Sequence, residues 1–168
     1  MDAFSNPEIV NLTEKYTGTW GLNHARRLIK LVEIIGRGQN FNQDVIWVAA
    51  HLHDWGAYAP WARDGVDHAE RSRQVAAQVL PLMGYSARFI QQVLECVAAH
   101  HRGGNNLCVE AVLLSDADAL DFLGVVGVLR VFAKKPRNLK DACATARKRM
   151  SQLPDQLCLE RSRAIAEM

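Results

Sequence analysis

Residues 42–56, NQDVIWVAAHLHDWG, contain an apolar segment with helical spacing that is followed directly by the pair His53-Asp54. Asn42 is suited to cap a helix predicted over residues 43–53, because its side chain can accept a hydrogen bond from a free N–H of the first turn. The apolar residues before His53 indicate that this helix is largely buried. A carboxylate without a partner is costly in such surroundings, and a divalent cation is the strongest partner for Asp54. His53 and Asp54 are therefore candidate metal ligands.

Helical spacing of apolar residues dominates the rest of the chain, and no alternating strand pattern competes with it. We therefore predict an all-α fold, a single-domain helical bundle over residues 1–168. Asn23, Asp67 and Ser86 are the expected N-caps, and residues 103–106 (GGNN) are an expected turn. Helices are expected over residues 23–35, 43–53, 68–82, 87–101, 107–114 and 116–130, with one or two polar helices after Pro136.

Composition excludes several classes of protein. The formal net charge of the 168 residues is +2, which is too small to indicate a nucleic-acid or membrane partner. The basic pairs and triplets at 134–135 and 147–149 are interpreted as solvated helix faces. We expect a cytoplasmic protein, because the N-terminus lacks a signal peptide and no apolar run could span a bilayer. Four dispersed cysteines without a Cys-x-x-Cys pair argue against a zinc cluster.

A second group of charges, at Asp116, Asp118 and Asp121, lies within a very apolar segment. Two interpretations are open: these carboxylates ligate a metal, or they accept hydrogen bonds from helix ends and pair with arginines. Asp116 and Asp118 would project to opposite sides of a helix, so only one of them can face an ion. Apolar periodicity alone favours Asp116.

These residues carry a resemblance to a known family. His24, His53-Asp54 and Asp118 match, in order, the H…HD…D signature of the HD-domain superfamily of metal-dependent phosphohydrolases, in its small bacterial stand-alone form. The chain departs from the pattern at Ala119, where an arginine is usual, and at Trp55, where a branched residue is usual. Relatives are expected to continue for another helix, so helices over 137–168 are expected to be incomplete. Supporting matches are HARRL (24–28), HLHDWG (51–56), HAERS (68–72), VAAH (97–100) and DADALDFLG (116–124).

The resemblance implies a helical bundle around a central metal ion. Its implied ligands are His24, His53, Asp54 and Asp118. The family pattern thus selects Asp118 as the ligand, whereas the apolar periodicity selects Asp116. Mixed nitrogen and oxygen ligands suit Mn, Fe, Co, Ni or Zn and tolerate Mg. Three further matches, at positions that touch substrate phosphate, a second metal or a ligand carboxylate, are His68, His100 and Arg27.

The function implied is hydrolysis of a phosphate ester or phosphoanhydride, with a phosphorylated small molecule, most plausibly a nucleotide, as substrate. An alternative is a non-catalytic HD module that senses a nucleotide or a partner. It is favoured by Ala119 and by the lack of an obvious Lys/Arg-rich phosphate cradle near the motif. A third, less favoured, reading is a two-iron oxygenase, which the histidine count permits. The sequence does not indicate an oligomeric state.

Overall fold

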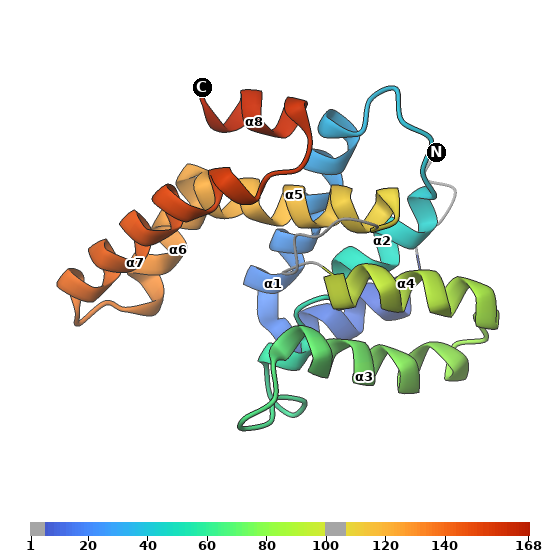
Figure 1. Ribbon diagram of the computed structural model, residues 1–168. Coiled ribbons are helices and arrows are strands. Elements are labelled where there is room, and N and C mark those ends of the chain that lie inside the picture. The colour runs from blue at the N-terminus through green and yellow to red at the C-terminus, as the bar shows by residue number, and fades with distance from the viewer. Residues whose placement is uncertain (1–5, 100–106) are drawn as a thin grey trace.

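The computed structural model describes residues 6–99 and 107–168, and every regular element in these ranges is a helix (Figure 1). The all-α prediction is confirmed. Two single-turn 3₁₀ segments, η1 (Trp55–Ala57) and η2 (Pro154–Gln156), interrupt the helices. The helices are α1 (Pro7–Ile35), α2 (Gln43–Leu52), α3 (His68–Leu82), α4 (Ala87–Ala99), α5 (Val109–Leu123), α6 (Val125–Lys134), α7 (Leu139–Gln152) and α8 (Glu160–Ala166).

Three helix starts follow from capping side chains that the sequence displays. Asn42 accepts N–H bonds from the first turn of α2, at 3.0 and 3.2 Å. Asp67 does the same for α3, at 3.1 and 3.2 Å, and the hydroxyl of Ser86 lies 3.4 Å from a first-turn N–H of α4. Each cap satisfies donors that the helix itself leaves free. The predicted end of α4 at His101 and the predicted turn over 103–106 lie outside the described residues.

Helix α1 begins earlier than predicted, at Pro7 rather than after Asn23. Asn6 caps it, and Gly18 divides it at a kink with φ +67°. Glycine adopts this left-handed conformation without the clash that a Cβ would cause, so the chain bends and continues as helix. Before the kink, Thr13 is buried and accepts a hydrogen bond from the indole of Trp55 at 3.2 Å, which connects this segment to η1.

The two helices predicted over 107–114 and 116–130 are also wrong in their boundary. Helix α5 runs unbroken through Asp116 and ends at Gly124, whose extended backbone starts α6. Gly127 then passes so close to the last turn of α5 that a Cβ there would collide with the backbone at Asp121 and Phe122. Helices α6 and α7 form a hairpin that extends away from α3 and α4 (Figure 1).

The core lies where α5 packs against α1, α2 and α4, and α3 covers α4. Fully buried apolar side chains from all these helices fill it, including Leu28, Val48, Leu80, Val93 and Leu113. Complete burial of such side chains contributes about 1.5–3 kcal/mol each. Among the described residues, no helix has the length and apolar character that crossing a membrane requires.

Candidate metal centre and adjoining cavity

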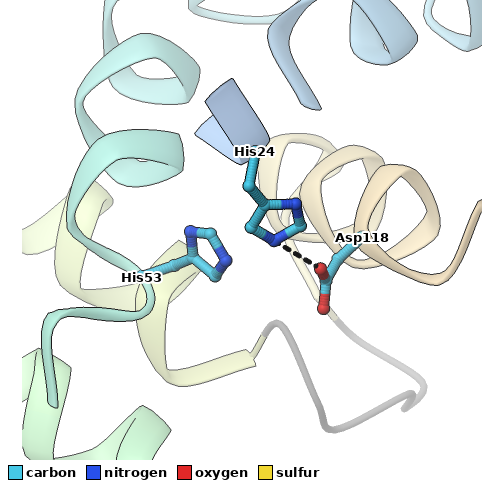
Figure 2. A group of neighbouring side chains, drawn as sticks. All are labelled: His24, His53 and Asp118. Atoms are coloured by element: carbon cyan, nitrogen blue, oxygen red, sulfur yellow. Dashed lines mark ion pairs between the residues drawn. The ribbon is translucent and has the colours of Figure 1, made fainter. Parts of the chain in front are cut away.

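Three helices bring His24, His53 and Asp118 together. His24 comes from α1, His53 directly follows α2, and Asp118 comes from α5 (Figure 2). All three are buried, with at most 3 % of each residue exposed. One ligand atom from each lies within 4.8 Å of the others. Residues separated by 94 positions in the sequence therefore meet at one point in the core.

Hydrogen bonds on the far side of each imidazole fix which nitrogen faces this point. Nδ1–H of His53 donates to the carbonyl of Ala50 at 2.9 Å, and Nδ1 of His24 lies 2.7 Å from Oδ2 of Asp121. Both Nε2 atoms are thereby directed to the meeting point, and that of His24 approaches Oδ1 of Asp118 at 3.1 Å. Metal-binding histidines commonly have their second nitrogen held in this way.

Asp54 joins the same group from its rim. Its Oδ2 lies 3.6 Å from Nε2 of His53 and 4.0 Å from Nε2 of His24. Its Oδ1 lies 3.7 Å from Nε2 of His68, the first residue of α3. The Asp54 side chain is 18 % exposed, so it is less buried than the sequence suggested. We refer to His24, His53, Asp54 and Asp118 as the His–Asp group.

The pKa values of the two histidines diverge. Burial alone would lower the pKa of His24, but its contacts with Asp118 and Asp121 and the charge of Asp54 raise it to about 9. Burial lowers the pKa of His53 and outweighs the attraction of Asp54. Without a metal ion, His24 thus carries a proton between carboxylates, at a place where a bound cation would replace that proton.

Asp121 supports His24 from behind. Its carboxylate accepts hydrogen bonds from Arg27, at 2.6 and 2.9 Å, as well as the contact from His24. Burial alone would raise the pKa of Asp121, but Arg27 and His24 hold it well below its usual range. The structure therefore places Arg27 against a carboxylate that orients His24, and Arg27 does not line the cavity described below.

Asp116 has a separate role in the fold. Its two carboxylate oxygens accept the backbone N–H groups of Cys158 and Leu159, both at 2.9 Å, just before α8. Asp118, two residues on, is the one that lies beside His24. The three carboxylates of the acidic segment thus differ: Asp116 accepts hydrogen bonds at a helix end, Asp121 pairs with an arginine, and Asp118 lies in the His–Asp group.

A cavity of about 620 Å³ opens onto the His–Asp group. Asp54, Asp118 and His68 line one side of it. Basic residues that line the cavity are Arg63, Arg130, Lys134, Lys135 and Arg149. The expectation that no Lys/Arg-rich cradle exists near the site is therefore wrong. Residues 134–135 and Arg149 of the 147–149 triplet, all expected on solvated helix faces, line this cavity. The signal was missed because four of the five basic residues lie beyond the motif, in or next to the α6–α7 hairpin, while Arg63 lies between η1 and α3.

The His–Asp group fits a divalent metal ion. It offers imidazole nitrogens that face one point together with carboxylate oxygens, the mixed ligand set that first-row transition metals accept. The helices fix these atoms from behind through Ala50 and Asp121. His68 lies at the edge of the group, while His100 lies outside the described residues.

A helical bundle with a buried His–Asp group beside a basic cavity defines an HD-domain architecture. Residues 21–123 match the HD domain family, and this match covers more than half of the chain. The chain belongs to the HD-domain family. Among curated proteins, no sequence matches this chain.

Solved structures extend the likeness across nearly the whole chain. A predicted HD superfamily hydrolase from an uncultured Thermotogales bacterium is 25 % identical, with a TM-score of 0.68 over 96 % of this chain and 82 % of that one. An HD-superfamily hydrolase from Bacillus thuringiensis is 20 % identical, with a TM-score of 0.70 over 96 % and 86 %. YpgQ of Bacillus subtilis, solved in complex with ADP, is 20 % identical, with a TM-score of 0.70 over 96 % and 87 %. The last two likenesses concern the fold alone.

Proposed function

We propose that the protein is a metal-dependent phosphohydrolase that cleaves a phosphate ester or phosphoanhydride, with a nucleotide as substrate. The observation that carries this proposal is the His–Asp group, three of whose four members are buried, at the side of a cavity that is otherwise rich in basic residues. Such a cavity attracts a phosphorylated molecule and directs its phosphoryl group toward the ligand set. Membership of the HD-domain family supports the same reaction class.

In this proposal His24, His53, Asp54 and Asp118 hold one divalent ion. When bound, the ion supplies Lewis-acid polarisation of a phosphoryl oxygen and a water of lowered pKa. The protein supplies the rest: Asp121 and Ala50 keep the imidazoles oriented, and the basic residues bind and orient the substrate. His68, whose Nε2 lies 3.7 Å from Asp54, is placed to exchange a proton or a hydrogen bond at the cavity wall.

The choice of a nucleotide rests on the size of the cavity and on one neighbour. A volume of about 620 Å³ lies within the range of sites that hold drug-sized ligands. YpgQ, which has a similar fold, is solved with ADP.

The test is a screen of phosphomonoesters, phosphodiesters and nucleotides with the full-length protein in Mn²⁺, Co²⁺ or Mg²⁺. We expect metal-dependent release of phosphate or pyrophosphate from at least one nucleotide, and loss of this activity in excess EDTA. Nucleotide binding without turnover in every metal would instead favour the sensor module. Two irons per chain by elemental analysis, with oxygen consumption, would favour the oxygenase.

His68→Ala is expected to lower kcat/KM about 10–100-fold while the metal is retained, the range usual for groups just outside a ligand set. The reason is that His68 contacts Asp54 and lines the cavity but lies beyond the buried members of the group. We expect the same of His100→Ala from the sequence match. Steady-state kinetics and elemental analysis on the same preparations check both predictions, and unchanged kinetics would assign the two histidines a purely structural role.

A further inference from the structure

One arginine of the cavity wall is buried without a counter-ion. Arg130, in α6, is only 4 % exposed, and its Nη1 has no hydrogen-bond partner among the described residues. No carboxylate in the described part of the chain forms an ion pair with it. Tyr58, which carries no charge to balance that of Arg130, accepts a hydrogen bond from this guanidinium. The remaining Nη1 donor is costly, because it loses hydration and gains no acceptor in return.

Two further cations share its surroundings. Arg149, in α7, lies half-buried with its Cζ 4.3 Å from the centroid of the Phe122 ring, and Cζ of Arg130 lies 5.5 Å from the same centroid. Lys134 lines the same cavity one turn after Arg130. Lys135 differs, because its ammonium group already forms an ion pair with Asp141 at 2.6 Å and donates a hydrogen bond to Thr145 at 2.8 Å. We call Arg130, Lys134 and Arg149 the basic wall.

The members of the basic wall repel one another. Burial and the charge of Arg130 lower the pKa of Lys134 and of Arg149. The negative charges that act against this lowering are Asp54 for the pKa of Lys134 and Asp118 for the pKa of Arg149, both in the His–Asp group. A metal ion in that group would neutralise those carboxylates and leave the basic wall with an excess of positive charge. An oxyanion within the cavity would satisfy it.

The ring of Phe122, which lines the cavity, contacts both His24 and the arginines of the basic wall. Its ring centroid lies 5.7 Å from that of His24, while the two arginines contact the same ring. We propose that the basic wall is an oxyanion subsite, which binds a phosphoryl group of the ligand other than the one directed to the His–Asp group. That this ligand is the substrate rests on the proposed function, whereas oxyanion binding by the basic wall does not.

The test measures binding of inorganic phosphate to the full-length protein by calorimetry, both as purified and in excess EDTA, with the fold checked by circular dichroism. Arg130→Met and Arg149→Met should each raise the phosphate Kd about tenfold or more in EDTA, the value of a lost charged hydrogen bond. Arg147→Met is the matched control, since Arg147 lies exposed on α7 and does not line the cavity. It should leave the Kd unchanged.

Unchanged phosphate affinity in folded Arg149→Met and Arg130→Met would overturn the subsite. If Arg130→Met does not fold, Arg149→Met decides alone, because its side chain is only half-buried. Loss of phosphate binding in these variants, with no nucleotide hydrolysed by the wild type, would support the subsite and refute the proposed hydrolysis. If the wild type hydrolyses a nucleotide but neither arginine substitution changes the phosphate Kd, the proposed hydrolysis is supported and the subsite is refuted.

Discussion

Asp54→Ala is expected to reduce bound metal from about one ion per chain to almost none and to lower hydrolysis more than about a hundredfold. Changes just outside a ligand set already cost about 10–100-fold in affinity or activity, so loss of a ligand should exceed that. Asp54 lies 3.6 and 4.0 Å from the Nε2 atoms of the two histidines, and its removal leaves three ligands to offset the dehydration of the ion. His53→Ala should behave in the same way. Elemental analysis and a hydrolysis assay measure the two effects.

Asp64→Ala is the matched control for this prediction. Asp64 is a carboxylate that lines the same cavity, but it is exposed and lies outside the His–Asp group. The Asp64→Ala variant should retain the metal. Full metal content in Asp54→Ala would refute the placement of Asp54 in the ligand set, whatever the activity of that variant.

A pair of isosteric substitutions on α5 should separate metal binding from folding. Asp118→Asn is expected to lose the metal, because it removes the negative charge beside Nε2 of His24. Asp116→Asn is expected to retain the metal but to lower the free energy of unfolding by about 1.5–3 kcal/mol, the value of hydrogen bonds to a charged group. The reason is that the Asp116 carboxylate accepts two backbone N–H groups, and an amide presents only one oxygen.

Elemental analysis and urea denaturation of the two variants check this prediction. Each variant is the control for the other, since both change one carboxylate to an amide on the same helix. If Asp116→Asn loses the metal while Asp118→Asn keeps it, the assignment is wrong and the apolar periodicity identifies the ligand.

Local signals in the sequence predicted most of the helices. Helix starts could be predicted at Asn42, Asp67 and Ser86, because a capping side chain bonds to an N–H group only two or three positions further along the chain. The start of α1 carries the same kind of local signal, an Asn6 cap before Pro7, but Gly18 interrupts the helical pattern and the start was placed after it. The junction of α5 and α6 was misplaced because Gly124 ends α5 at a single residue with extended backbone, and the apolar pattern continues across it.

The candidate site divides in the same way. Its buried members stood out because histidines and aspartates are conspicuous in apolar segments, and the family pattern selected among them. Arg130 and Arg149 gave no such signal, because arginines are ordinary on helix faces and nothing local indicates that α6 and α7 fold back to the cavity. The support that Asp121 gives to His24 joins residues 97 positions apart, so only the folded chain displays it.

The bonds made by Asp116 bear on the order in which the nascent protein matures. Asp116 is 1 % exposed, and its partners Cys158 and Leu159 are made 42 and 43 residues later. At ribosomal speeds of about 5–20 residues per second, this delay is about 2–8 s. During it, the helix that presents Asp118 carries a carboxylate that resists burial. Asp118, the last member of the proposed ligand set, is already synthesised by then. We therefore expect the set to acquire its metal only after the segment before α8 has bound Asp116.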